Sequence, residues 1–219
     1  MNVLITGTSR GIGRAVAQYF LDKGSHVIGI DIEPSTIDSP TYEHHVANVR
    51  FAEQLPELGE INALFINAGI QNSGHDIDTN LKGAMHVAEK YAFGEKVKAV
   101  LFNASASARS GYEFPEYVAS KAGVVGYMKN LACRLAPHGV TVNSISLGGV
   151  LTDSNRLVME DEACWKQIMD VTPLKKWMSE EEVAEWVYFL LVHNRSMSGQ
   201  DVLIDNGEYD LNSTFVWPK

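Results

Sequence analysis

The fold of this chain is decided near its beginning, by the stretch Val3-Leu4-Ile5-Thr6-Gly7-Thr8-Ser9-Arg10-Gly11-Ile12-Gly13. A short apolar strand leads into a glycine-rich turn, and a helical pattern follows directly. Glycines there allow a tight turn and a close approach of the backbone to a phosphate, and the N-terminus of the helix adds a positive dipole. The stretch predicts a dinucleotide-binding loop between the first strand and the first helix. Taken alone, it is also compatible with a plain connecting loop.

Short apolar runs alternate with helical patterns along the rest of the chain. The predicted strands are residues 3–5, 27–30, 63–66, 99–102, 140–142 and 202–204, with a weaker one at 42–46. Strands that are apolar throughout indicate a sheet covered by helices on both faces. The sequence therefore predicts the α/β class, with a doubly wound, mostly parallel sheet of about seven strands in a Rossmann-like three-layer sandwich.

The length of 219 residues suits one sizeable domain, and no repeat or linker divides it. We therefore expect a single dinucleotide-binding domain over residues 1–219. Within it, residues 151–178 break the alternation of strands and helices. We interpret them as an irregular helical lid on the substrate side.

Composition excludes several classes of function. The 18 basic and 27 acidic residues give a net charge of −9, which disfavours binding to nucleic acid. No apolar run reaches the ~18 residues of a membrane span, and no signal peptide is visible. Two cysteines are too few for a disulfide framework, which favours a reducing, cytoplasmic setting. The seven histidines show no metal-binding spacing, so we expect no metal.

Asp31 ends the second predicted strand, where dinucleotide-binding folds place an acidic residue. A carboxylate at this place accepts hydrogen bonds from the adenosine ribose and repels a 2′-phosphate, which favours NAD over NADP. Arg10 argues in the opposite direction, because a guanidinium in the glycine loop can bind a 2′-phosphate. Since Ile32 and Glu33 follow Asp31 in place of a basic residue, we expect NAD; the alternative for Asp31 is a turn residue at a strand end.

Tyr117 and Lys121 stand one helical turn apart, on one face of a long helical pattern. An ammonium beside a phenol stabilises the phenolate, and this brings the pKa of the phenol toward the working range of an acid-base catalyst. Such a pair also occurs by chance on a helix surface. Its meaning therefore depends on the other motifs of the chain.

The complete set of motifs resembles the short-chain dehydrogenase/reductase family over nearly the whole chain. The order of the motifs is that of the family. Beside the glycine loop and the Tyr117–Lys121 pair, the motifs are Asn67-Ala68-Gly69, Asn80-Leu81-Lys82-Gly83, Ser105, Gly148-Gly149-Val150-Leu151-Thr152, Pro173-Leu174, Glu182-Val183-Ala184 and Ser198-Gly199-Gln200.

The resemblance implies hydride transfer between a nicotinamide cofactor and a secondary alcohol or ketone. It makes Tyr117 the general acid or base, and Lys121 the group that lowers the pKa of Tyr117 and holds the ribose. Ser105 would bind the reacting oxygen, and Asn80 would anchor a water that relays protons from Lys121. The implied cofactor-binding residues are Gly7, Ser9, Arg10, Gly11, Ile12, Gly13, Asp31, Ile32, Asn48, Val49, Asn67, Ala68, Gly69, Tyr117, Lys121, Val150 and Thr152.

Some features depart from the family pattern. Ser105 lies only 12 positions before Tyr117, and Ser107 is available as an alternative. The loop at residues 70–79 is short, which should open one wall of the cleft or leave it to a partner subunit. The resemblance also implies a homodimer or homotetramer. Two other functions stay open: a 3-oxoacyl thioester reductase of the same family, and a dinucleotide-binding regulator with little turnover.

The substrate itself is not determined by the sequence. We expect residues 109–116 and the segment 151–178 to form the specificity wall of the cleft. The side chains in question are Tyr112, Phe114, Met159 and Trp165, which are equally compatible with packing roles.

Overall fold

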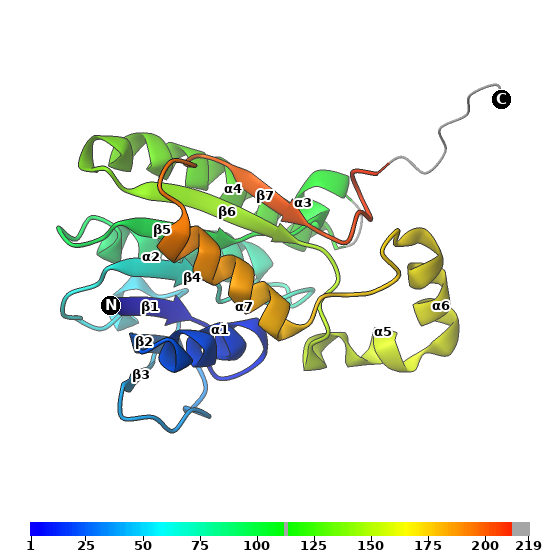
Figure 1. Cartoon of the computed structure of the whole chain (residues 1–219), viewed down its shortest axis with the longest axis horizontal. Coiled ribbons are helices and arrows are strands. Elements are labelled where there is room, and N and C mark those ends of the chain that lie inside the picture. Colours follow the sequence, from blue (N-terminus) through cyan, green and yellow to red (C-terminus); the bar gives the residue numbers. More distant parts are fainter. Residues whose placement is uncertain (112–113, 212–219) are drawn as a thin grey trace.

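The structure is a computed structural model that describes residues 1–111 and 114–211. Within these residues, seven strands form one sheet in the order β3-β2-β1-β4-β5-β6-β7, and every neighbouring pair is parallel (Figure 1). The strands are β1 (Asn2–Thr6), β2 (His26–Asp31), β3 (Tyr42–Val46), β4 (Ala63–Ile66), β5 (Ala99–Asn103), β6 (Thr141–Leu147) and β7 (Asp201–Ile204). The predicted parallel sheet is confirmed.

Helices cover both faces of this sheet. On one face α1 (Gly11–Asp22) and α7 (Glu180–Tyr188) contribute to a core with alternate strand residues such as Val3 and Ile5. On the other face α2 (Ala84–Tyr91) and α4 (Pro115–Leu135) pack with the residues in between, such as Leu4. This alternation follows from the two-residue period of a strand. It confirms the three-layer sandwich.

Shorter helical segments complete the described chain. They are η1 (Ala52–Gln54), η2 (Ile77–Gly83), α3 (Ser107–Ser110), η3 (Ala136–His138), η4 (Asp153–Asn155), α5 (Arg156–Glu160), α6 (Glu162–Val171) and η5 (Phe189–His193). Among the described residues, no helix combines the length and the apolar character that a membrane crossing requires.

The strand β6 is longer than its apolar residues suggest. The sequence predicted residues 140–142, but the strand continues to Leu147 through the buried residues Asn143, Ser144 and Ser146. The two serine hydroxyls donate to the carboxylate of Asp201 in β7. A prediction from apolar character ends too early here, because the polar side chains find their partner on the neighbouring strand.

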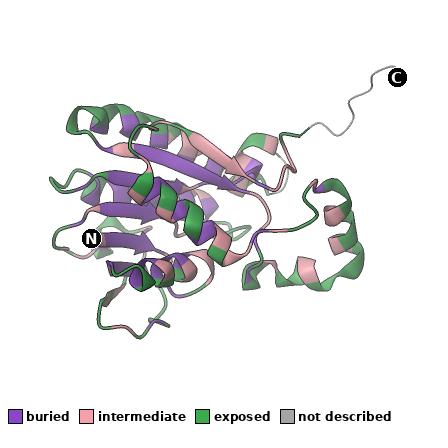
Figure 2. Cartoon of the chain, viewed as in Figure 1, coloured by how far each residue is buried: buried purple, intermediate pink, exposed green. Residues whose placement is uncertain are grey.

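Residues 151–178, for which the sequence predicts an irregular helical lid, leave the sheet and form the helices α5 and α6; we call this segment the lid below. The helices α5 and α6 stand apart from the sheet in Figure 1, and neither has a buried residue in the described structure. In Figure 2 the ribbons of both helices have the colours of exposed and intermediate residues, whereas the strands are mostly coloured as buried.

The two ends of this lid meet at one point. Leu151 N donates to Met178 O at 2.8 Å, and Met178 N donates to Gly149 O at 3.1 Å. A β-carbon on Gly149 would lie 2.0 Å from the Trp177 indole, so only glycine lets this ring close over the backbone. The two ends of the lid are thus joined at a narrow neck beside the end of β6, and Leu174 N, which donates to Asn206 O at 3.2 Å, also ties the lid to the residues after β7.

Candidate active site

The candidate site lies at the carboxyl ends of the central strands. The chain leaves β1 toward β2 and β3, and continues from β4 on the other side of β1. In a doubly wound sheet, this change of direction opens a crevice at the carboxyl ends of the strands. The residues predicted from the sequence cluster around it.

The glycine loop between β1 and α1 has the predicted close contacts. Gly7 adopts a left-handed φ of +79°, and its amide donates to Ile30 O at 2.8 Å. A β-carbon on Gly13 would lie 1.9 Å from Gly7 O, and one on Gly7 would lie 2.9 Å from Asn67 Nδ2. Both positions therefore exclude any larger residue. The loop is shaped by backbone packing, as a phosphate-binding turn requires.

Asp31 fixes this loop against the end of β2. Its Oδ2 accepts from Ser9 N at 2.9 Å, and its Oδ1 accepts from Glu33 N at 3.0 Å. Next to it, Ile32 is exposed, and so is Arg10 at the start of α1. The sequence assigned Asp31 to the ribose. The structure adds that the same carboxylate organises the loop.

A continuous chain of hydrogen bonds joins β1, β4 and β5 to the helix α4. Asn67 Nδ2 donates to Thr6 O at 2.9 Å, and Asn103 Nδ2 donates to Asn67 Oδ1 at 2.9 Å. Lys121 Nζ then donates to Asn103 O at 2.8 Å. Such a network fixes each member through its neighbours. The sequence analysis missed Asn103, although a polar residue at the end of an apolar strand was its visible indication.

Lys121 is the buried end of this chain, with 4% of its surface exposed. Burial lowers the pKa of its ammonium to about 8, while the charge of Asp76 opposes that shift. Its Nζ lies 5.7 Å from the centroid of the half-buried Tyr117 ring. A chance pair on the helix surface would leave the lysine in water. The interpretation of Tyr117 and Lys121 as such a surface pair is therefore wrong.

Asn80 lies in the π-helical turn η2 and is almost fully buried. Its Oδ1 accepts from Ile70 N at 2.8 Å, and its Nδ2 donates to Ile70 O and to Ser120 Oγ, each at 2.9 Å. Ser120 Oγ in turn donates to Tyr117 O at 2.7 Å. Asn80 therefore connects the short loop after β4 to the N-terminal part of α4.

Gly69 brings Asn80 and Lys121 together. A β-carbon at this glycine would lie 3.2 Å from Asn80 Oδ1 and 3.3 Å from Lys121 Nζ. The two polar groups thus border the same small space. This is the place that the resemblance assigns to a proton-relaying water.

Ser105 and Ser107 form a hydroxyl pair after β5. Their Oγ atoms are 2.6 Å apart, and Ser107 N donates to Ser105 Oγ at 3.2 Å. Both residues are buried. The structure therefore does not choose between them by exposure; it shows one as the direct partner of the other.

The short loop at residues 70–79 closes around a carboxylate that the sequence analysis missed. Asp76 is fully buried and accepts from the amides of Asn72 and Ser73, each at 2.8 Å. Burial alone would raise the pKa of Asp76, but hydrogen bonds from Ser73 and Asn72 outweigh it and lower the pKa. This carboxylate is a negative charge in the surroundings of Lys121.

The remaining predicted cofactor residues follow the carboxyl ends of β3 and β6. Val49 is buried beside Gly83, where a β-carbon would lie 2.7 Å from Val49 Cγ2, and the side chain of Asn48 accepts from Arg50 N. Val150 pairs with Met178 at the neck of the lid, and Thr152 is buried next to it.

The predicted specificity wall is only loosely packed. Phe114 has 39% of its surface exposed, and Met159 is half-buried. The rings of Trp165 and Trp177 meet edge to face, with centroids 5.1 Å apart. Tyr112 lies outside the described residues. Over the described parts of the chain, no group of three histidine, cysteine, aspartate or glutamate side chains is arranged to hold a metal ion.

The fold and the site together define a class of protein. A glycine loop at the switch point of a doubly wound sheet, beside a tyrosine and a buried lysine one turn apart, is the arrangement of a dinucleotide-binding oxidoreductase.

Comparison with known proteins narrows this class to a family. A family described as enoyl-(acyl carrier protein) reductase matches residues 7–208. The chain belongs to the short-chain dehydrogenase/reductase family and is an oxidoreductase of that family.

Relatives with different names align over nearly the full length. The chain is 27% identical to the 3-oxoacyl-[acyl-carrier-protein] reductase FabG of Staphylococcus epidermidis, over 95% of this chain and 98% of the relative. Levodione reductase superposes with a TM-score of 0.83 at 26% identity, covering 94% and 96% of the two chains. The aldohexose dehydrogenase of Thermoplasma acidophilum gives 0.84 at 26% identity, covering 100% and 97%. The relatives thus agree in fold and differ in the substrates that they are named for.

Proposed function

We propose that this protein is an NAD(H)-preferring dehydrogenase or reductase that interconverts a secondary alcohol and its ketone. The observation that carries the proposal is the position of Lys121. A buried ammonium, held at Asn103 O and 5.7 Å from the Tyr117 ring centroid, has a chemical purpose beside a proton-transferring phenol. A regulator that only binds a dinucleotide does not need this arrangement.

The residues of the crevice fit a dinucleotide. The glycine loop offers backbone amides at a helix N-terminus, and the space beside Gly7 and Gly13 admits no side chain. Asp31 places a carboxylate at the end of β2, and its two oxygens retain lone pairs beyond the two amides that they bind. When bound, the nicotinamide would supply or accept the hydride.

The protein's own residues would handle the proton and the reacting oxygen. Tyr117 donates a proton to the carbonyl oxygen in reduction and removes it from the alcohol in oxidation. Lys121 favours the phenolate form through its charge. A hydroxyl of the Ser105–Ser107 pair donates to the same oxygen, where charge develops.

Asp31 is the basis for the NAD preference. Its carboxylate repels the additional phosphate of NADP, and no basic residue follows it at Ile32 or Glu33. Arg10 is exposed at the loop, and its positive charge favours NADP.

A 3-oxoacyl thioester reductase is the second candidate. The aligned relatives with that name cover almost the whole chain, which supports it. The net charge of −9 argues against it, because an acidic acyl carrier docks on a basic surface. The homodimer or homotetramer expected from the resemblance stays a prediction, which light scattering tests.

Replacing Tyr117 by phenylalanine tests the chemistry. We expect Tyr117→Phe to fold and to bind NADH as the wild type does, but to lose turnover by about 10²- to 10⁴-fold, because the proton donor is gone. Turnover is followed by NADH absorbance with a panel of secondary alcohols and ketones. Wild-type rates in this variant would overturn the mechanism, and dinucleotide binding without turnover in the wild type would favour the regulator.

Replacing Asp31 by asparagine tests the cofactor preference. The neutral side chain keeps one acceptor oxygen and loses the charge, so the ratio of kcat/KM for NADH over NADPH should fall about tenfold. Glu33→Gln is the matched control, since it removes an exposed charge two residues away and should change this ratio less. A wild-type preference for NADPH would contradict our interpretation of Asp31.

A further inference from the structure

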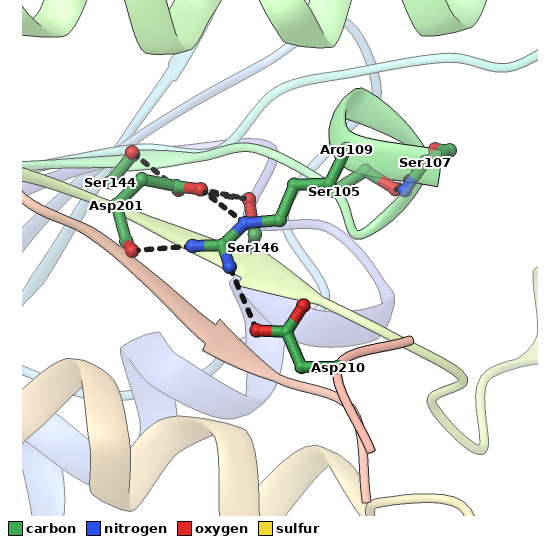
Figure 3. Close-up of polar contacts among 7 residues, drawn as sticks. All are labelled: Ser105, Ser107, Arg109, Ser144, Ser146, Asp201 and Asp210. Carbon is green, nitrogen blue, oxygen red and sulfur yellow. Dashed lines mark hydrogen bonds and ion pairs between the residues drawn. The ribbon is translucent and has the colours of Figure 1, made fainter. Parts of the chain in front are cut away.

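Arg109 joins the turn after β5 to a strand far away in the sequence. It lies in α3, and its guanidinium reaches the first residue of β7 (Figure 3). Arg109 Nε donates to Asp201 Oδ2 at 3.1 Å, and Nη2 donates to Asp201 O at 2.8 Å. Nη1 contacts Asp210 Oδ2 at 3.2 Å. The family motifs discussed above include none of these three residues.

Asp201 is the fixed point of this cluster. Only 10% of its side chain is exposed, and its Oδ1 accepts from Ser144 Oγ at 2.7 Å and from Ser146 Oγ at 2.8 Å. Both serines are fully buried in β6. A largely buried carboxylate needs a countercharge and satisfied lone pairs, and Arg109 supplies the countercharge. The guanidinium is therefore held by a rigid part of the sheet, whereas Asp210 at its other end is 64% exposed.

The helix α3 depends on such an anchor. It has only four residues, Ser107–Ser110, and ends at Gly111 with a left-handed φ of +71°. One isolated helical turn is not stable without tertiary contacts. The backbone before it is fixed, because Ala104 N and Ala106 N donate to β6 carbonyls at 2.8 and 2.9 Å. Beyond Ala106, the Arg109 side chain ties the turn to β7 through its two hydrogen bonds to Asp201.

This turn carries the partner of Ser105. Ser107 lies in its first position, with its Oγ 2.6 Å from Ser105 Oγ and its amide 3.2 Å from the same atom. The direction in which Ser105 can donate its hydroxyl hydrogen therefore depends on where Ser107 is held.

We propose that Arg109 is a positioning residue, which orients the Ser105–Ser107 hydroxyl pair by locking α3 onto Asp201. This inference rests on the proposed function, because it assumes that the pair binds the reacting oxygen. Arg109 does not touch that oxygen; it acts through the turn. The same pairing occupies the guanidinium, so Arg109 does not serve as the binding site of a substrate carboxylate.

The test compares Arg109→Met with Arg134→Met. Arg134 is a similarly exposed arginine that also pairs with a carboxylate, Glu89, but it lies at the far end of α4. For Arg109→Met we expect kcat to fall about 10- to 100-fold, with KM for NADH unchanged, because a misplaced hydroxyl stabilises the transition state less. Arg134→Met should leave kcat unchanged. Arg109→Lys keeps the positive charge but loses the paired N–H donors of the guanidinium. Its kcat should therefore lie between those of the wild type and of Arg109→Met.

Two further readouts separate positioning from mere stabilisation. In a double-mutant cycle, adding Ser107→Ala to Arg109→Met should cost much less kcat than Ser107→Ala costs alone, because both changes act through one hydroxyl pair. If Arg109 only stabilises the fold, kcat measured well below Tm stays at the wild-type value and only Tm falls. That result, or full additivity in the cycle, would overturn the proposal.

Hydrogen exchange keeps the inference separate from the proposed function. In Arg109→Met, peptides that cover residues 104–111 should exchange their amides at least tenfold faster, while peptides of β1 and β4 stay protected. This readout needs no turnover. If Tyr117→Phe retained activity but the peptides of residues 104–111 exchanged faster in Arg109→Met, the proposed mechanism would be wrong. The role of Arg109 in holding α3 would still be supported. Unchanged exchange in residues 104–111 would refute the anchor in either case.

Discussion

The dinucleotide-facing edge of the sheet and the lid are built in opposite ways. At the edge, polar side chains from β1, β4, β5 and α4 are linked in one hydrogen-bonded chain that ends at the buried Lys121. In the lid, α5 and α6 contribute no buried residue to the described structure. The two regions therefore differ in how firmly the rest of the fold holds them. The groups that we propose for proton transfer are held by the core, while the proposed specificity wall is held by few contacts.

The largest effect on stability is expected at Asn67. Asn67→Ala leaves Thr6 O and Asn103 Nδ2 without this partner, so the free energy of unfolding should fall by about 2 kcal/mol. Asn155→Ala removes one hydrogen bond at the start of the lid, to Val150 O, and should cost less than about 1 kcal/mol. Urea unfolding measures both variants. If both variants lost the same free energy of unfolding, the two regions would be held equally firmly, which would contradict our comparison.

A smaller effect is expected from the titration of Lys121. Above the pKa of its ammonium, the rate of ketone reduction should fall about tenfold per pH unit. Burial lowers the pKa of Lys121 to about 8 in the folded chain, below its value in the unfolded chain. Ketone reduction should therefore decline as pH rises through about 8, when the ammonium is lost. Stability should change in the opposite direction, rising with pH in this range, because the unfolded chain then binds more protons than the folded one.

The pH dependence of ketone reduction is measured as the rate of NADH oxidation from pH 6 to 10. In Lys121→Arg the charge persists over the whole range, so any activity that remains should lack the inflection near pH 8. If the inflection near pH 8 were unchanged in Lys121→Arg, a group other than Lys121 would cause it. The buried environment of Lys121 would then not control the rate.

A similarly small effect on stability is expected at Trp165, in the lid. Its ring contacts Trp177 edge to face, a pair worth about 1 kcal/mol. Trp165→Ala should therefore change the free energy of unfolding by about 1 kcal/mol or less, while KM for the alcohol or ketone rises several-fold and the Kd for NADH stays constant. A large loss of stability would mean that the lid belongs to the core.

The fold was predictable because its evidence is local. Apolar runs mark the strands, and glycines mark a loop in which Gly13 admits no side chain. The start of α7 is equally local, because Ser179 and Glu182 form a capping box through reciprocal hydrogen bonds between each side chain and the other's backbone amide. Each of these features depends on residues within one or two turns of one another.

What the sequence did not predict depends on partners that are distant along the chain. The polar half of β6 is stable in the sheet because Ser144 and Ser146 meet Asp201, more than fifty residues later. Arg109 meets the same carboxylate across 92 positions. Asp76 is closer to its partners, but the turn that buries it has no apolar pattern. Such groups become visible only when the topology brings them together.

The narrow neck of the lid has a consequence for how this chain can change. Because Gly149 and Leu151 are each hydrogen-bonded to Met178, residues 152–177 begin and end at the same place on the sheet. The entropic cost of closing such a loop grows only slowly with its length. We therefore expect that an insert of another length or shape can be grafted between these two points while the sheet keeps its register, so that the proposed specificity wall can be exchanged to engineer new substrate preferences.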